Sequence, residues 1–190
     1  MKFSHLSFAH SYWTSHLYIG ASVIDATCGN GHDALFIAKK ILNNTQGSLY
    51  IFDIQESAIN QAKTHLSSHL DKESYKRVHF YKQCHSNFPN ELQEKSIDLI
   101  VYNLGYLPGG NKSITTTKET TLISLERSLK LIKPLGLISI TCYPGHLEGE
   151  KEEELLLTWA KSLDPLNWSA SFHKRINYSK APSVLFLCRL

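Results

Sequence analysis

Cysteine is scarce in this chain, and the cysteines that it has are widely separated. The four residues Cys28, Cys84, Cys142 and Cys188 form no C-x-x-C pair. This spacing matches neither the usual zinc-ligand patterns nor a disulfide framework. We therefore expect no metal site and no structural disulfides, and a reducing cytoplasm as the location of the protein.

Long apolar runs and a strong excess of one charge are also missing. No stretch approaches the roughly 20 apolar residues of a membrane helix, so we expect no membrane association. Polar residues such as His5, His10 and Ser11 interrupt the start of the chain, which argues against a signal peptide. Twenty Lys and Arg residues against 17 Asp and Glu residues permit a polyanionic partner such as RNA without requiring one.

What the chain does have is enough apolar mass for one hydrophobic core. Its 190 residues are 42% hydrophobic, which is typical of a soluble globular protein about one domain long. We expect a single domain over residues 1–190, in which the aromatic and histidine-rich residues 1–20 form an amino-terminal cap segment.

Short apolar runs alternate with helical patterns along the chain, and this rhythm predicts an α/β fold with a mostly parallel sheet and helices on both faces. Only a short turn around residues 180–182 separates the last two strands, so they must form an antiparallel hairpin. This pattern resembles the Rossmann-like fold of class I methyltransferases. The predicted strands are 22–26, 48–52, 77–82, 97–102, 136–142, 168–178 and 183–189, and the predicted helices are 33–42, 57–70, 117–132 and 149–163.

A glycine turn follows the first predicted strand. The segment Gly29-Asn-Gly-His-Asp-Ala34 matches the pattern G-x-G-x-x-A, which is weak evidence alone because several nucleotide cofactors use it. Asp25 discriminates between them, because a carboxylate there would repel a pyrophosphate but attract the ammonium group of a methionine moiety. We therefore expect S-adenosylmethionine as the cofactor, in contact with Asp25, Cys28, Gly29, Asn30, Gly31, His32 and Asp33.

The ends of the next two strands supply further cofactor candidates. Asp53 can accept hydrogen bonds from both ribose hydroxyls, with Gln55 adding a polar contact; its alternative role is that of a simple helix N-cap. Cys84 and His85 follow the third strand, where this fold contacts adenine. His85 either stacks on or hydrogen-bonds to the base or is a solvent-facing loop residue, and Cys84 has the alternative role of a small buried apolar residue.

The fourth strand ends in a second informative segment. Asn103-Leu-Gly-Tyr106 resembles the N-P-P-Y box of methyltransferases that act on amino groups of nucleobases. In that box the Asn oxygen and a main-chain carbonyl, here that of Leu104 or Gly105, accept hydrogen bonds from the target nitrogen. We expect Asn103 and Tyr106 to be catalytic, with Tyr106 as an aromatic face for a flipped base and Asn103 and Leu104 also beside the cofactor. The alternative is that the segment is merely a turn.

Taken with the glycine turn, this segment makes the chain resemble a particular family over nearly its whole length. The segments 25–33 and 103–110, with Lys118-Glu-Thr-Thr121 after them, resemble small bacterial proteins labelled rRNA methylases and the MnmM-type tRNA 5-(aminomethyl)-2-thiouridine methyltransferases. The resemblance implies transfer of one methyl group to the aminomethyl nitrogen of the wobble base, with the tRNA anticodon stem-loop as partner. One departure is Gln83-Cys-His-Ser86, where a Gly-Ser-His-Glu-like stretch is expected.

Three other functions stay open at this point. An amine methyltransferase acting on rRNA adenine or a small molecule would share every cofactor feature. An NAD-linked oxidoreductase is disfavoured by Asp25, and a non-catalytic RNA-binding module is disfavoured by the intact segment 103–106. The acceptor of the amine proton is also open, with His32 and His85 as candidates, and so is the pairing of two chains as a homodimer.

Overall fold

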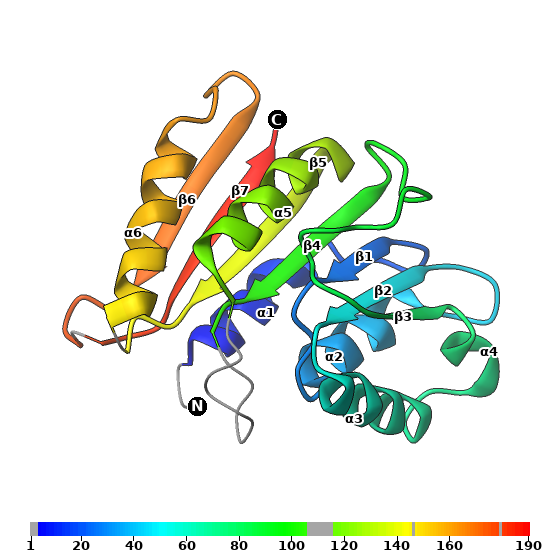
Figure 1. The fold of residues 1–190 in the computed structure, drawn as a ribbon. Helices are drawn as coiled ribbons and strands as arrows, with labels where there is room; N and C mark the ends of the chain where they lie inside the picture. Colours follow the sequence, from blue (N-terminus) through cyan, green and yellow to red (C-terminus); the bar gives the residue numbers. More distant parts are fainter. Residues whose placement is uncertain (1–3, 106–115, 146, 179) are drawn as a thin grey trace.

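The chain forms one seven-stranded sheet with helices on both faces (Figure 1). The structure is a computed structural model that describes residues 4–105, 116–145, 147–178 and 180–190. The strands are β1 (Ser22–Asp25), β2 (Ser48–Asp53), β3 (Val78–Lys82), β4 (Ile97–Asn103), β5 (Ile132–Cys142), β6 (Trp168–Lys174) and β7 (Ser183–Arg189). The helices are α1 (His5–Thr14), α2 (His32–Ile41), α3 (Glu56–Ser67), α4 (Lys72–Tyr75), α5 (Lys118–Leu131) and α6 (Leu147–Lys161).

The strand order β3-β2-β1-β4-β5-β7-β6 confirms the predicted fold class. The first five strands in this order run parallel to their neighbours, whereas β7 is antiparallel to both β5 and β6. The chain leaves β1 toward one edge of the sheet and continues from β4 toward the other. In open α/β sheets, ligands bind at the carboxyl ends of the strands at such a switch point.

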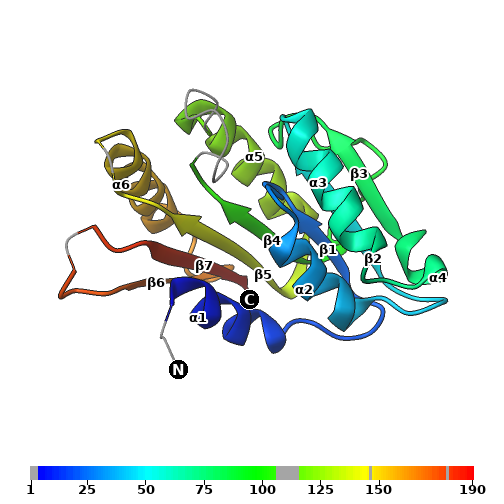
Figure 2. The same ribbon diagram turned by 90° about the horizontal axis from the view of Figure 1, so that it is seen from below.

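Two apolar layers sandwich the sheet because side chains alternate along each strand. One layer joins α1, α2 and α3 to the sheet, and the other joins α5 and α6 to its opposite face. Figure 2 shows α1 on one side of the sheet and α5 and α6 on the other. All the residues of β4 except the last are buried, as expected for a central parallel strand covered on both faces.

The amino-terminal segment contains a helix that the apolar pattern does not predict. Helix α1 starts with a capping box in which Ser4 and Ser7 bond each other's backbone N–H groups. It buries Ala9 and Trp13, and Tyr12 stacks on Phe186 of β7 at a ring-centroid distance of 4.1 Å. Aromatic residues bury much area even in a short helix, so tertiary packing rather than intrinsic propensity stabilises it.

Other boundaries also differ from the sequence-based expectation. Strand β6 ends at Lys174 instead of residue 178, because its pairing with β7 stops at Ser183. Strand β5 begins at Ile132, since Ile132 already pairs with Ile97 of β4 and a bulge separates this pair from the following ladder. No helix in the described part of the chain is long and apolar enough to cross a membrane.

A buried carboxylate connects the amino ends of the central strands through hydrogen bonds. It lies at the end of the strands opposite the switch-point crevice. Asp98 of β4 accepts hydrogen bonds from the Tyr18 hydroxyl at 2.9 Å and the Ser22 backbone N–H at 2.8 Å. It also accepts from Lys133 Nζ, at 2.8 and 2.9 Å to its two oxygens. These contacts join the segment before β1 to β4 and β5.

We therefore expect Asp98→Ala to lower the free energy of unfolding by about 2 to 4 kcal/mol, because the half-buried Ser22 and Lys133 and the exposed Tyr18 lose their acceptor. Urea denaturation measures this change. The matched control is Glu73→Ala, which removes an exposed ion pair with Lys76 and should cost at most about 1 kcal/mol. Equal losses in the two variants would contradict the role of Asp98.

Candidate active site

Three polar side chains stand at the carboxyl ends of neighbouring strands. Asp53 ends β2, Asp25 ends β1 and Asn103 ends β4. Strand β1 lies between the other two, with Asp25 paired in register to Ile51 and Val101. The topology therefore brings together residues that are up to 78 positions apart in the sequence, as the strand pattern predicts.

The glycine turn connects β1 to α2 in a conformation that needs glycine. Gly29 and Gly31 have positive φ angles of 49° and 79°, which L-residues with side chains rarely adopt. A Cβ on Gly31 would also lie 2.9 Å from the Cα of Ala62. Gly29 N donates to Asp53 Oδ2 at 3.0 Å, and Cys28 N donates to the Phe52 carbonyl at the same distance. The turn is thus fastened to the end of β2.

Asp25 is fully buried and only partly satisfied. Its Oδ1 accepts from Thr27 N at 3.3 Å, whereas its Oδ2 has no hydrogen-bond partner in the part of the chain that the structure describes. Burial raises the pKa of Asp25 well above the ordinary value, and the nearby carboxylates Asp33 and Asp53 raise it further. Burial also raises the pKa of Asp53, against backbone hydrogen bonds that lower it.

Among the described residues, a histidine is the only basic side chain that pairs with these carboxylates. In the described ranges no Lys or Arg forms an ion pair with Asp25, Asp33 or Asp53, and only His10 pairs with Asp33. Buried carboxylates without a cation are costly, and a positively charged ligand would relieve that cost. The crevice therefore favours a cation over an anion.

Asp53 does not cap the helix that follows it. Its Oδ1 accepts from Gln55 N at 2.9 Å and its Oδ2 from Gly29 N, while the N-cap of α3 is Gln55, which makes no side-chain capping bond. The N-cap alternative is therefore wrong. Each carboxylate oxygen keeps a second lone pair, so the ribose contact stays a prediction for Asp53.

Two polar atoms of Asn103 donate hydrogen bonds, whereas its side-chain oxygen has no partner among the described residues. Its backbone N donates to Thr27 Oγ1 at 2.6 Å, and its side-chain Nδ2 donates to Asp33 Oδ2 at 2.9 Å. The side-chain Oδ1 is buried and has no partner. Leu104 N, the next donor along the chain, bonds the Thr141 carbonyl at 2.9 Å. An unused acceptor therefore lies at the end of β4, where the sequence predicts the target amine.

Residues of β5 and α1 complete this part of the site, and the sequence patterns did not single them out as site residues. Thr141 pairs in register with Asn103, and its buried Oγ1 also lacks a partner. Tyr143 follows β5, and its hydroxyl lies 3.2 Å from His5 Nε2. Burial first, and then Asp33, raises the pKa of Tyr143 to about 12. Only the histidines among residues 1–20 gave a signal that this segment carries polar function.

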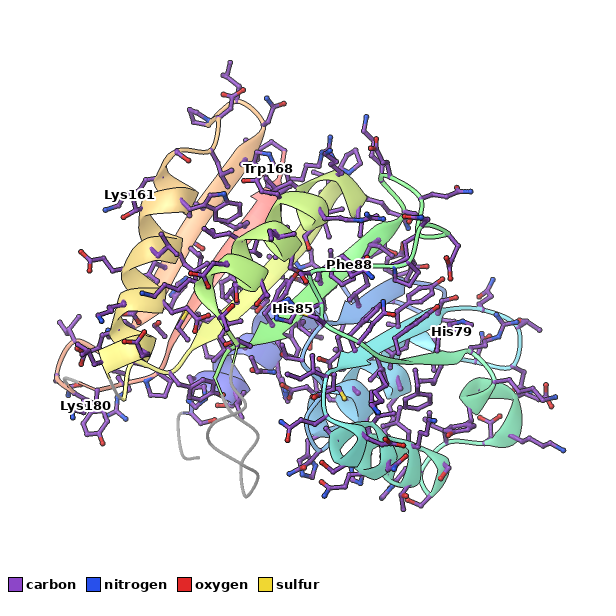
Figure 3. The ribbon with its side chains drawn as sticks, in the orientation of Figure 1. His79, His85, Phe88, Lys161, Trp168 and Lys180 are labelled. Atoms are coloured by element: carbon purple, nitrogen blue, oxygen red, sulfur yellow. The ribbon has the colours of Figure 1, made fainter. Side chains whose placement is uncertain are left out.

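His85 lies in the interior and not in solvent. It is 6% exposed, and its ring meets Tyr102 edge to face at a centroid distance of 5.7 Å. Figure 3 shows it with Phe88 in the connection between β3 and β4. The solvent-facing alternative is therefore wrong. Burial lowers the pKa of His85 to about 4, which makes it a poor proton acceptor near neutral pH. Cys84 nearby is half-buried and accepts from Ser86 Oγ at 3.1 Å.

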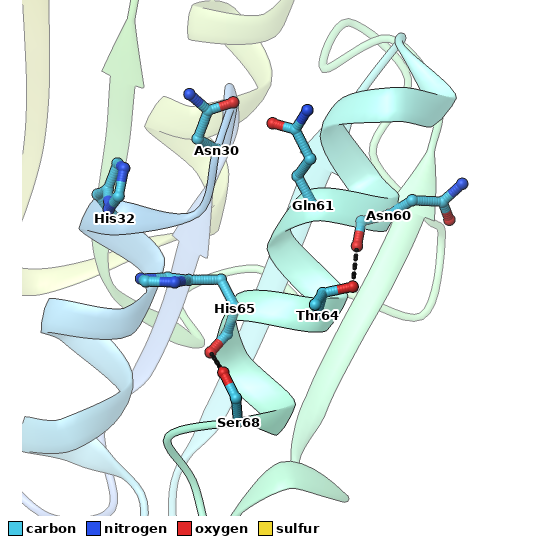
Figure 4. Close-up of a pocket in the computed structure, with 7 residues that line it drawn as sticks. All are labelled: Asn30, His32, Asn60, Gln61, Thr64, His65 and Ser68. Carbon is cyan, nitrogen blue, oxygen red and sulfur yellow. Dashed lines mark hydrogen bonds between the residues drawn. The ribbon is translucent and has the colours of Figure 1, made fainter.

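Asn30 and His32 line an open pocket between α2 and α3. Figure 4 shows His65 of α3 directed toward His32, with Asn30 and Gln61 at the other end of the pocket. The His32 and His65 rings lie 4.9 Å apart, and the pocket has a volume of about 470 Å³. His32 therefore lies at the amino end of α2 on the outer side of the glycine turn.

Tyr106 lies outside the described residues, but the positions that flank this segment are fastened to each other. Gly105 N donates to Thr116 Oγ1 at 2.9 Å, and Thr116 N donates to the Gly105 carbonyl at 3.1 Å. Glu152 of α6 accepts from Thr121 at 3.2 Å and from Thr116 at 3.3 Å. Burial raises the pKa of Glu152.

Proteins with this strand order and carboxyl-terminal hairpin form the class I methyltransferases, and solved structures with the same fold carry methylase or methyltransferase names. The chain belongs to the family described as "Putative rRNA methylase", whose model matches residues 49–189. This confirms the resemblance drawn from the glycine turn and the segment after β4.

Three relatives illustrate this membership. A chloroplastic tRNA (mnm(5)s(2)U34)-methyltransferase of Arabidopsis thaliana is 35% identical over 183 residues, which are 94% of this chain and 67% of that protein. The crystal structure of a "putative rRNA-methylase" from Clostridium thermocellum has a TM-score of 0.91 and 30% identity, with both chains fully covered. A "putative methyltransferase" from Streptococcus mutans, in complex with SAH, has a TM-score of 0.85 and 26% identity, again with both chains fully covered.

The burial of Asp25 leads to a test with a defined sign. Because its folded-state pKa exceeds the unperturbed value of 3.8, the folded protein binds this proton more tightly than the unfolded chain. Its stability therefore falls as pH rises from about 4 through the folded-state pKa. We expect Asp25→Asn to raise the Tm of the ligand-free protein at pH 7.5, with the difference vanishing near pH 4.

The same variant should bind S-adenosylmethionine at least about tenfold more weakly in calorimetry, because the cationic tail loses a charged partner. Asp71→Asn is the control, since Asp71 caps α4 at the surface and is not in the crevice. It should leave both Tm and affinity nearly unchanged, because Asn caps helices as well as Asp. Undiminished affinity in Asp25→Asn would remove Asp25 from the cofactor site.

Proposed function

We propose that this protein is an S-adenosylmethionine-dependent methyltransferase that methylates the aminomethyl nitrogen of 5-aminomethyl-2-thiouridine at the wobble position of tRNA. The observation that carries the proposal is the buried, unpartnered Asn103 Oδ1 at the edge of a crevice lined by carboxylates. Family membership and the name of the Arabidopsis relative support the reaction and the substrate.

The residues of the crevice fit the cofactor. S-adenosylmethionine carries an ammonium group and a sulfonium, and when bound it supplies an electrophilic methyl group. The unpartnered Oδ2 of Asp25 is suited to the ammonium group, and Asp53 to the ribose hydroxyls. Gly29 and Gly31 keep the turn free of side chains beside these groups. The remaining cofactor contacts proposed on the family pattern are Cys28, Asn30, His32, Asp33, Gln55, Cys84, His85 and Leu104.

Asn103 positions the amine. Its Oδ1 accepts an N–H of the neutral aminomethyl group, which directs the nitrogen lone pair away from the amide and into the crevice. An aliphatic amine is mostly protonated near neutral pH, so a proton must leave before transfer. The low pKa of His85 argues against it as the acceptor. Methyl transfer then needs no covalent intermediate with the protein, only the alignment of two bound groups.

The partner in this proposal is the tRNA anticodon stem-loop, which displays the wobble base unpaired. The location in this proposal is the cytoplasm, supported by four cysteines that are all free thiols. A second candidate substrate is an exocyclic amine of rRNA adenine. The family description and the name of the Clostridium thermocellum protein favour it, and the same acceptor geometry would serve it.

Labelled-methyl transfer tests the substrate. Purified protein with S-adenosylmethionine should label tRNA whose wobble base carries the unmethylated aminomethyl group, and nucleoside mass analysis should find one added methyl on that base. Matched tRNA without the aminomethyl group should remain unlabelled, because it lacks the nucleophile. Labelling of rRNA adenine instead would establish the second candidate and reject the first.

Substitution of the acceptor tests the mechanism. Asn103→Ala should retain cofactor affinity within about twofold yet lose about 100-fold or more in single-turnover rate, because the amine is no longer aligned. Asn90→Ala is the control, since Asn90 is exposed and its side chain accepts a hydrogen bond from Arg127 at the surface. A full single-turnover rate in Asn103→Ala would show that the amine is held elsewhere.

A further inference from the structure

Two hydrogen bonds in series connect helix α1 to the Asn103 amide. His10 Nε2 of α1 lies 2.6 Å from Asp33 Oδ1, and Asp33 Oδ2 accepts from Asn103 Nδ2 at 2.9 Å. Both oxygens of Asp33 are therefore engaged by the protein. The Asp33 side chain is 12% exposed and that of His10 is 26% exposed, so both bonds are largely sheltered from water.

The carboxylate fixes which way the amide faces. A terminal amide can turn over, exchanging its donor and acceptor ends, but an ionised carboxylate only accepts hydrogen bonds. Asp33 therefore selects the orientation with Nδ2 toward itself and Oδ1 toward the crevice. A donor bond to a charged acceptor also polarises the amide and strengthens Oδ1 as an acceptor. Without Asp33, either end of the amide could face the amine.

The histidine in turn holds the carboxylate. His10 stacks on Phe36 of α2 at a centroid distance of 4.0 Å and an interplanar angle of 14°, and its ring lies 4.9 Å from that of Trp13. These contacts fix the plane of the imidazole. His10 can donate from Nε2 in one neutral tautomer and in its protonated form, so the bond to Asp33 survives a change of its charge.

We propose that Asp33 and His10 are positioning residues for amine methylation, which act through the orientation of the Asn103 amide. The proposal rests on the proposed function, in which Asn103 Oδ1 accepts the amine. It assigns Asp33 to support of the substrate acceptor in place of the predicted cofactor contact, because the hydrogen bonds of its two oxygens connect His10 with Asn103. It also makes α1 part of the active site.

Four variants test this in the full-length protein. Asp33→Asn keeps the size of the side chain but allows the Asn103 amide to face either way, and His10→Phe keeps the stacking while removing the donor. His10→Gln restores a donor near the position of Nε2. The control is His79→Phe, since His79 of β3 (labelled in Figure 3) stacks on Tyr50 at 5.0 Å but is exposed and far along the strand from the crevice end.

The readouts are kcat at saturating aminomethyl-tRNA and S-adenosylmethionine, the cofactor Kd and the Tm. We expect Asp33→Asn and His10→Phe to lower kcat by about tenfold or more while the Kd changes by less than about twofold. His10→Gln should recover most of the rate lost in His10→Phe, and His79→Phe should keep the full rate. A fifth variant that combines Asp33→Asn with His10→Phe should be no slower than Asp33→Asn alone, because both changes break the same series of hydrogen bonds.

The outcomes separate this inference from the proposed function. Full kcat in Asp33→Asn and His10→Phe, beside a slow Asn103→Ala, would overturn the positioning role and leave the proposed function intact. A raised Kd with unchanged kcat would overturn it by making Asp33 a cofactor ligand. Equal losses of kcat and Tm in His10→Phe and His10→Gln would overturn the positioning role of His10, because they would show that it only holds α1 against the rest of the protein. A fast Asn103→Ala would instead show that the amine is held elsewhere and would reject this inference, whereas no labelling of aminomethyl-tRNA by the unsubstituted protein would reject the proposed function.

Discussion

The site is organised around an electrostatic imbalance at the end of β1. Asp25 is fully buried, has a hydrogen bond on one oxygen only and is close to two further carboxylates, and in the described part of the chain no Lys or Arg forms an ion pair with any of the three. A folded protein that keeps such a cluster loses stability near neutral pH, since burial disfavours the ionised forms. A ligand that places a cationic group beside Asp25 would offset that loss. The same cluster explains why a nucleotide with a pyrophosphate would be rejected by a turn that otherwise suits it.

The sheet keeps the buried carboxylates in place because it fixes the ends of the strands rigidly. Parallel pairing sets Asp25 between the ends of β2 and β4, and the positive φ angles of the glycine turn bring backbone N–H groups back onto Asp53. At the opposite end of the sheet, Asp98 of β4 accepts hydrogen bonds from Ser22 of β1 and from Lys133 of β5. Rigid elements with a polar edge are what a reaction governed by alignment requires.

Two faces of the sheet contribute differently to the site. On the face covered by α1, α2 and α3 lie Asp33, His10 and Asn103, in one continuous set of hydrogen bonds. On the opposite face, Tyr102 bonds Ser124 and Ser128 of α5, and His85 packs against its ring. Adjacent residues of β4 thus serve separate purposes, because their side chains alternate between the faces. The Asn103 side chain lies at the crevice, while Tyr102 bonds α5 on the opposite face of the sheet.

Local patterns in the sequence were sufficient to predict the alternation of strands and helices, the hairpin at the end, the glycine turn and the strand-end residues Asp25, Asp53 and Asn103. These are local signals, set by periodicity, turn chemistry and short motifs. Only the tertiary structure decided that His85 is interior, that Asp53 binds the glycine turn instead of capping α3, and that a helix in residues 1–20 brings His10 to Asp33. Those features arise from contacts between distant segments, such as Tyr12 on Phe186, and no local pattern encodes which distant surface a short aromatic helix will meet.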